Sequence, residues 1–463
     1  MSNNLHHLLK QIPSVDEIIV ELQLSKINIP HDLIVNTIRQ SLKDIRKSIT
    51  ENNVSDNIHK FTLSEVRNNV EIVAQIGLRK VINGTGIVLH TNLGRTPISK
   101  SVIDTAMSKL SCYSNLEVDI LSGKRGERTS HIEHLINSLT SSQSSMVVNN
   151  NASAVLLMLN TIAEGKEVII SRGQQVEIGG SFRIPDVINK SGCQMVEVGT
   201  TNKTHFSDYE NAITKDTGAI LVAHTSNYKV VGFTQEVELL ELSKLAKRKR
   251  IPLLVDLGSG AIADFNHYGL PNEESVKWYL KSGADLVSFS GDKLLGGPQS
   301  GIICGKKLLV KKTQKNALYR ALRCDKFTFA ILEEILRTYR TSKDVSENNL
   351  TIHLLTRNRA KLLKLGRNIL KTLPSKIIEK YGITLVDSEV EAGSGSLPTE
   401  KIESVSLIFS STYEKPSNTA KKFRLATVPV LGYIHGNRFR IDLKAIPNEQ
   451  IADLSKIMIE VLA

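Results

Sequence analysis

The chain has 463 residues, far more than one small domain needs to bury a core, so two or three domains are expected. With 41% hydrophobic and 23% charged residues it has the composition of a folded globular protein, and the lack of any apolar run of about eighteen residues excludes a membrane-spanning helix. Its 59 basic and 47 acidic residues give a net charge of +12, which allows nucleic acid or phosphorylated partners without requiring them.

Two further features indicate the compartment. Residues 1–20 lack the basic start, continuous apolar stretch and small-residue cleavage site of a secretory signal, so we expect a cytoplasmic protein. The cysteines are scattered and form no C-x-x-C pair, which predicts reduced thiols rather than disulfides or a metal site. They are Cys112, Cys193, Cys304 and Cys324.

Residues 1–75 predict a small helical domain. Apolar residues recur at helical spacing in segments 15–23, 30–49 and 62–80. This pattern does not separate an RNA-binding domain from a dimerisation or packing domain, so both remain open on the residues alone.

Residues 76–340 predict an α/β domain. Short runs rich in β-branched residues alternate with helical stretches such as 152–163 and 236–250. Strands that are apolar on both faces and joined by crossover helices form a mainly parallel sheet covered on both sides. The predicted strands are 145–150, 166–171, 194–199, 219–224, 252–258, 284–290 and 301–305.

Residues 341–463 predict a smaller α+β domain. A helical pattern covers 358–374, and strand patterns cover 404–409, 428–436 and 438–443.

The reactive groups of such a parallel sheet gather beyond the carboxyl ends of its strands. One strand ends at residues 149–151, and a helix starts at Ala152 and Ser153, where backbone N–H groups and the helix dipole favour a phosphate. A simple N-cap by Asn151 or Ser153 is the alternative. Asp256 ends a strongly apolar strand, so it needs a cationic or N–H partner, unless it only caps a local loop.

Lys293 follows another strand end, in the segment SFSGDKLLGGPQSG. It is either an ordinary surface lysine or an amine among apolar neighbours, whose pKa falls on desolvation so that it can form a Schiff base. The sequence contains three elements in the order found in a pyridoxal-phosphate enzyme. They are a phosphate-binding segment, a carboxylate able to pair with a pyridinium nitrogen, and a lysine 37 residues after that carboxylate.

Two segments carry dense positive charge. Residues 244–250 end an amphipathic helix, where cations suit the helix C-terminus and solvent. Residues 306–326 contain Arg320 and Arg323, which are three apart on a predicted helix and therefore share a face that can hold an anion.

Several longer motifs resemble the bacterial selenocysteine synthases, the L-seryl-tRNA(Sec) selenium transferases. They include VINGTGIVLHTNLGRTPIS, SRGQQVEIGGSFRIPDV, HTSNYKVVGFT and SFSGDKLLGGPQSGIICGKK, and the resemblance runs across nearly the whole chain. It implies a fold-type I pyridoxal 5'-phosphate core, an N-terminal helical domain that contacts tRNA, a small C-terminal domain and a homodecamer built from dimers.

The resemblance also implies roles for individual residues. The implied catalytic residues are Lys293, as the Schiff-base lysine, and Asp292, which could instead only support Lys293. The implied cofactor-binding residues are Ala152, Ser153, Asp256, Ser290 and Lys293. The implied substrate-binding residues are Arg95, Thr200, Thr201, Arg320 and Arg323. The arginines would bind the phosphate of the selenium donor, because a guanidinium grips phosphate bidentately; the threonines could be turn residues only.

The implied reaction converts L-seryl-tRNA(Sec) to L-selenocysteinyl-tRNA(Sec) through a cofactor-bound aminoacrylate, with selenophosphate as the selenium donor. Two other classes stay open: a pyridoxal-phosphate lyase acting on a small phosphorylated amino acid, and a non-catalytic RNA-binding scaffold. The helical N-terminal domain argues against the lyase, because an enzyme that acts on a small substrate has no use for such a domain. Lys293 in its glycine turn behind Asp256 argues against the second.

Overall fold

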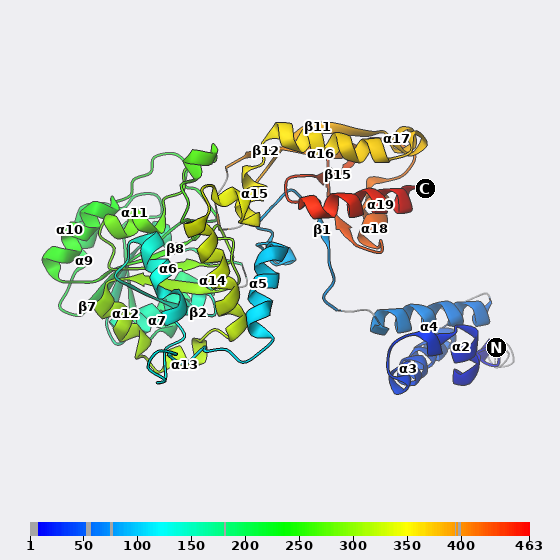
Figure 1. Ribbon diagram of the computed structural model, residues 1–463, viewed down its shortest axis with the longest axis horizontal. Coiled ribbons are helices and arrows are strands. Elements are labelled where there is room, and N and C mark those ends of the chain that lie inside the picture. The colour runs from blue at the N-terminus through cyan, green and yellow to red at the C-terminus, as the bar shows by residue number, and fades with distance from the viewer. Residues whose placement is uncertain (1–7, 52–56, 75–76, 180–181, 394, 397–399) are drawn as a thin grey trace. The chain divides into compact units, whose positions relative to one another are not determined.

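The computed structural model describes residues 8–51, 57–74, 77–179, 182–393, 395–396 and 400–463 (Figure 1). The chain divides into two compact units, Met1–Lys80 and Val81–Ala463. The finer division predicted at residues 75 and 340 stays a prediction. No helix within the described ranges is long and apolar enough to cross a membrane. The cysteines are free thiols, exposed at Cys112 and buried at the other three positions.

The first unit contains the helices α2 (Val15–Glu21), α3 (His31–Thr50) and α4 (Ile58–Ala74). Ser14 starts α2 with a capping box, in which its side chain accepts the Glu17 N–H and the Glu17 carboxylate accepts the Ser14 N–H. The helices predicted at 15–23 and 30–49 are confirmed. The one predicted at 62–80 ends at Ala74; positions 75–76 lie outside the described residues, and 77–80 are not helical.

The core of this unit follows from helical spacing. On α3, Ile34, Ile38 and Leu42 lie four residues apart and are all buried. They pack against Val66 and Val70 of α4, so one apolar stripe from each helix forms the core.

The second unit is built on a seven-stranded sheet with the strand order β2-β10-β9-β8-β7-β3-β6. The pairs among β6, β3, β7, β8 and β9 are parallel, and β10 runs antiparallel to both β9 and β2. The strands are β2 (Ser144–Val148), β3 (Glu167–Ser171), β6 (Gln194–Val198), β7 (Thr217–Ala223), β8 (Leu253–Gly258), β9 (Leu286–Ser290) and β10 (Gly301–Gly305). These are the seven predicted strands, so the mainly parallel α/β sheet is confirmed.

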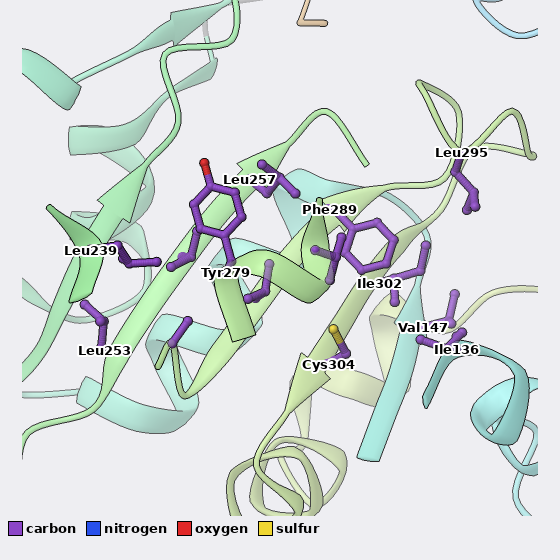
Figure 2. Packing of buried hydrophobic residues seen from close by; sticks show 14 of the residues in the cluster. Ile136, Val147, Leu239, Leu253, Leu257, Tyr279, Phe289, Leu295, Ile302 and Cys304 are labelled. Atoms are coloured by element: carbon purple, nitrogen blue, oxygen red, sulfur yellow. The ribbon is translucent and has the colours of Figure 1, made fainter. Parts of the chain in front are cut away.

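Helices cover both faces of this sheet. They are α5 (Lys100–Leu110), α6 (Ser130–Thr140), α7 (Asn151–Ala163), α8 (Ile184–Lys190), α9 (Phe206–Ala212), α10 (Leu239–Lys249), α11 (Val276–Lys281), α12 (Lys307–Gln314), α13 (Leu318–Leu322) and α14 (Lys326–Thr341). Val255 and Val287 pack with α6, α10, α11 and α14, whereas the alternate residues Leu254 and Leu286 pack with α7, α8 and α12. Figure 2 shows part of the first cluster around Phe289. Burial on both faces explains why these strands read as continuous apolar runs.

The C-terminal part of this unit has its own antiparallel sheet, with the order β11-β12-β15-β14. Its elements are α15 (Leu350–Thr356), α16 (Arg359–Thr372), α17 (Ser375–Tyr381), β11 (Ile383–Val390), β12 (Ile402–Phe409), α18 (Pro416–Arg424), β13 (Val430–Leu431), β14 (Tyr433–His435), β15 (Arg438–Asp442) and α19 (Ile451–Leu462). The short strand β1 (Ile82–Asn83) pairs with β13, and β4 (Glu177–Ile178) pairs with β5 (Phe182–Arg183).

The α+β character predicted for this region agrees with these elements, but its details differ from the prediction. The expected strand 428–436 is two short strands, β13 and β14, separated by Gly432. Strand β11 was not predicted, because most of its residues are half-buried or exposed and its apolar alternation is weak.

Candidate active site

The carboxyl ends of four strands meet at one edge of the large sheet. Across β10, Gly301 pairs with both Ser290 at the end of β9 and Val148 at the end of β2. Asp256 of β8 pairs with Ser288 of β9 on one side and with Ala223 of β7 on the other. The sheet therefore gathers the polar segments after these strands at one edge, as the sequence predicted.

Lys293 lies in a buried turn beyond β9, with only 4% of its surface exposed. The Gly296 N–H donates to the Lys293 carbonyl at 2.9 Å, and the Leu294 N–H donates to the Ser259 carbonyl at 3.0 Å. Gly296 has a φ of +76°, and a Cβ there would collide with the side chain of Asn349, so this tight turn requires glycine. Lys293 is thus not a surface lysine.

Burial lowers the pKa of Lys293. The negative charges of Asp256 and Asp292 oppose this shift, whereas the Arg95 guanidinium adds to it. The amine therefore loses its proton more easily than a solvated lysine, which suits it to act as a nucleophile.

Asp256 is also buried, at 5% exposure. Its Oδ1 accepts a hydrogen bond from Asn151 Nδ2 at 2.8 Å. Burial raises the pKa of Asp256, and the Asn151 hydrogen bond and the charges of Lys293 and His224 oppose that shift. The predicted N–H partner of this carboxylate is therefore Asn151, with two potential cations near it.

Lys293 and Asp256 converge with Ser226 at Gly258. A β-bulge after Asp256 gives Gly258 a φ of +70°. A Cβ placed on Gly258 would lie 3.8 Å from Lys293 Nζ, 3.9 Å from Ser226 Oγ and 4.0 Å from Asp256 Oδ1. An amine, a hydroxyl and a carboxylate thus converge on one point that no side chain occupies, and these are groups that can react with an aldehyde and pair with a basic ring nitrogen.

The start of α7 differs in detail from the prediction. The helix begins at Asn151, and its N-cap is Asn150, whose side chain accepts the Ser153 N–H at 2.8 Å. The alternative that Asn151 or Ser153 caps this helix is wrong, because Asn150 is the cap and the Asn151 side chain binds Asp256. Ala152 and Ser153 are half-buried at the sheet edge, where the helix dipole still favours an anion.

Arg95 is brought next to the lysine by Asp292. Its Nη1 donates to Asp292 Oδ2 at 2.6 Å, and the side chains are 29% and 10% exposed. Arg95 has a φ of +60°, and its N–H bonds to the His90 carbonyl at 3.0 Å, so a tight turn after residues 91–93 aims it. Ser290, the last residue of β9, is buried beside this group at 5% exposure.

Arg320 and Arg323 border a separate cavity of about 300 Å³. Arg320 is exposed, and Arg323 Nη1 lies 3.4 Å from Glu117 Oε1. Glu117 also binds Arg128 at 2.7 Å, and this hydrogen bond, ahead of the arginine charges, lowers the pKa of Glu117. The Asn149 N–H donates to the Leu322 carbonyl at 2.9 Å, which places the segment beyond the end of β2.

Thr200 and Thr201 are not brought to Lys293 within one chain. They follow β6, the edge strand, which is four strand spacings from β9, or roughly 20 Å. The Thr200 N–H donates to the Lys203 carbonyl at 2.8 Å, and Thr200 Oγ1 accepts the Lys203 N–H at 3.2 Å. In this chain the first threonine holds a turn.

The structure adds residues to this site that were missed in the sequence. His224 and Ser226 lie in the motif HTSNYKVVGFT, but neither that motif nor the surroundings of Glu273 predicted a place in this site, which all three approach only through folding. Gly395, in the connection between β11 and β12, approaches so closely that a Cβ there would collide with Lys293 Nζ. The glycine-rich composition of residues 393–395 was the only available signal.

Comparison with known proteins gives consistent matches. Residues 81–447 match the family described as SelA, L-seryl-tRNA selenium transferase. The L-seryl-tRNA(Sec) selenium transferase of Desulfotalea psychrophila is 40% identical over 461 residues, covering 98% of each chain. That of Alkaliphilus oremlandii is 41% identical over 465 residues, covering 98% of this chain and 99% of its own. A solved D-glucosaminate-6-phosphate ammonia-lyase has a TM-score of 0.58 at 19% identity and covers 84% of this chain and 98% of its own, a likeness that supports the fold alone.

Proposed function

The chain belongs to the L-seryl-tRNA selenium transferase family, and we propose that Lys293 and Asp256 form the centre of its active site. It is a fold-type I, pyridoxal 5'-phosphate-dependent enzyme that converts L-seryl-tRNA(Sec) to L-selenocysteinyl-tRNA(Sec). The lyase and scaffold alternatives are not favoured, because transferases of this one activity match 98% of the chain, including its helical N-terminal unit.

The observation that carries the site assignment is the convergence of Lys293, Asp256 and Ser226 at Gly258. Lys293 Nζ is free to take the cofactor aldehyde there, and the Asp256 carboxylate is available for the pyridine nitrogen. Ala152 and Ser153, at the start of α7, are the proposed phosphate-binding positions, and Ser290 at the end of β9 is a further proposed cofactor-binding residue.

When bound, pyridoxal phosphate draws electrons from the serine Cα and so acidifies its proton. Lys293, once its amine is released, takes that proton on Nζ, since burial favours the neutral amine. The same nitrogen would then give that proton to the departing serine hydroxyl, so that water leaves and Nζ is again a neutral amine. The burial of Lys293 and Asp256 limits access of bulk water to the labile ester.

We propose selenophosphate as the selenium donor, with Arg95, Arg320 and Arg323 as ligands of its phosphate. Arg95 is supported by its contact with Asp292, next to Lys293. Arg323 is supported by the arginine-rich cavity that it borders. A substrate contact by Thr200 and Thr201 stays a prediction, and from their distance it would require a second subunit.

Assembly and location are proposals of the same kind. We propose a cytoplasmic homodecamer built from dimers. Large apolar side chains that stand fully exposed in the single chain, such as Tyr113, Leu121 and Phe233, suit subunit contacts. Sedimentation of the purified protein measures this assembly directly.

We propose that the first unit contacts the tRNA backbone through α3. Arg39, Lys43 and Arg46 are exposed and recur at helical spacing, so they form one basic stripe. Replacing all three by glutamine is expected to weaken tRNA binding at least about tenfold and to flatten its salt dependence, because each cation releases counterions from the phosphates.

In the matched control, glutamine replaces three exposed lysines of the second unit, which are Lys244, Lys277 and Lys281. Equal tRNA affinity in the two triple variants, measured by filter binding at several salt concentrations, would reject the stripe. Cofactor binding should be unchanged in both.

Gly395 offers a steric test of the site. Alanine there places a Cβ against Lys293 Nζ, so the affinity for pyridoxal phosphate is expected to fall about tenfold. Gly436→Ala is the control, since it also has a positive φ, of +57°, but no atom within 4 Å of its Cβ position. Both variants should lose about 1 kcal/mol of unfolding free energy from backbone strain. Equal cofactor affinity in the two would contradict the proposed approach of Gly395.

The function is tested by incubating the cofactor-loaded protein with seryl-tRNA(Sec) and selenophosphate. The amino acid released from the tRNA is then identified by mass spectrometry. Selenocysteine is the expected product, and unchanged serine would refute the proposed function.

A further inference from the structure

A second polar pair borders the Lys293 site and takes no part in the steps above. His224 directly follows β7, and Glu273 lies in the loop before α11. His224 Nδ1 and Glu273 Oε1 are 4.0 Å apart, and the Glu273 side chain is only 4% exposed. Within the described part of the chain, both atoms are buried and neither has a hydrogen-bond partner.

The backbone holds His224 against Asp256. The His224 N–H donates to the Asp256 carbonyl at 2.9 Å, and the Ser226 N–H donates to the His224 carbonyl at 2.8 Å. The turn after β7 that His224 begins therefore also places Ser226 Oγ near Gly258, 3.9 Å from where a Cβ on that glycine would lie.

A buried carboxylate with an unpaired oxygen is costly unless a cation or a hydrogen-bond donor approaches it. The imidazole of His224 is the donor in reach. The 4.0 Å separation is longer than a direct hydrogen bond, and a small side-chain rotation would bring the two groups within hydrogen-bond distance.

The pair acts on both ionisable groups at the centre of the site. When its imidazole is protonated, His224 lowers the pKa of Asp256 against the larger effect of burial. The Glu273 charge raises the pKa of Lys293, again against burial. His224 thus favours an ionised carboxylate, and Glu273 favours a charged lysine nitrogen.

We propose that Glu273 is a positioning residue that fixes the imidazole of His224 against Asp256, so that the pair supports the Asp256 carboxylate as the partner of the pyridine nitrogen of the cofactor. A carboxylate on one ring nitrogen sets the tautomer and orientation of an imidazole, as it does for histidines that bind metals. This inference rests on the proposed function, because it assigns the pair to the pyridoxal phosphate site.

The first test is a double-mutant cycle on the dissociation constant for pyridoxal phosphate, titrated into cofactor-free protein. Glu273→Gln and His224→Gln are each expected to weaken binding about tenfold. The double variant should bind no more weakly than His224→Gln alone, because Glu273 acts through the imidazole. If the loss of affinity in the double variant equalled the product of the two single losses, the proposal would be overturned.

The second test is spectroscopic and reports on the folded, coloured protein. The pH midpoint of its visible absorption band is expected to fall by about half a unit or more in Glu273→Gln, since a negative charge near the Lys293 nitrogen is removed. The other ionisable groups around the pair are the same in wild type and in Glu273→Gln. They are Asp256 on β8, Asp292 and Lys293 after β9, Arg95, Glu274, and Tyr279 on α11.

Glu274→Gln is the matched control, because it changes the same chemistry one residue away, where the side chain accepts from Asn272 at 3.1 Å. A binding constant and midpoint of Glu273→Gln equal to those of Glu274→Gln would overturn the proposal. A wild-type protein that binds no pyridoxal phosphate would instead refute the proposed function, so the two failures are distinguishable.

Discussion

Replacing Lys293 with alanine is expected to abolish the visible absorption band of the cofactor-loaded protein and to lower selenocysteine formation by about 10⁴-fold. The variant loses both the amine that takes the cofactor aldehyde and the base that takes the Cα proton. Absorbance and single-turnover assays measure the two losses.

Two controls separate chemistry from folding. Lys293→Arg keeps a cation in the site but cannot form a Schiff base, so it should be as colourless as the alanine variant. Lys281→Ala removes an exposed lysine of α11 and should behave as wild type. A visible band that survives in Lys293→Ala would show that another residue carries the cofactor.

Replacing Asp256 with asparagine is expected to give the second largest loss, about 10³-fold in activity, with weaker cofactor binding. Asparagine has nearly the same shape and can still accept the Asn151 hydrogen bond, but it has no charge to keep the pyridine nitrogen protonated. Steady-state assays at saturating cofactor measure the loss. An activity equal to that of Asp216→Asn, a change at an exposed aspartate, would refute this role.

The same substitution is expected to lower activity but not to lower the stability of the cofactor-free protein. Burial raises the pKa of Asp256, so the cofactor-free folded state holds this proton more tightly than the unfolded chain. The group's contribution to stability therefore falls as pH rises from its ordinary value through the folded-state value. Asparagine avoids that loss, so cofactor-free Asp256→Asn should melt at the same or a higher temperature than wild type at neutral pH. Markedly earlier melting would indicate a structural role for Asp256.

The two central residues could be found in the sequence because their signals are local. Asp256 and Lys293 each come at or just after an uninterrupted apolar run, and such runs become central strands buried on both faces. A parallel sheet then gathers the segments beyond those strands at one edge. The helices of the first unit were equally accessible, because Ile34, Ile38 and Leu42 repeat with the helical period.

Contacts between distant segments could not be found in this way. Asn151 and Asp256 are 105 positions apart, and only the folded sheet brings them to 2.8 Å. Gly395 meets Lys293 from the connection between two C-terminal strands, and Glu273 meets His224 from a loop without secondary structure. No periodic or compositional pattern in the sequence identifies the residue that each of these residues contacts.

By itself, the sequence determined the helical first unit, the seven strands of the parallel sheet, and the lysine and aspartate at its edge. Hydrophobic periodicity and strand ends depend on residues that are close in the sequence, so they can be recognised from the sequence alone. Only the tertiary structure decided which amide binds Asp256, which residue caps α7, how far Thr200 lies from Lys293, and that His224 and Glu273 face each other. These outcomes depend on strand order, loop paths and the burial of charge, which arise when distant parts of the chain pack together and exclude water.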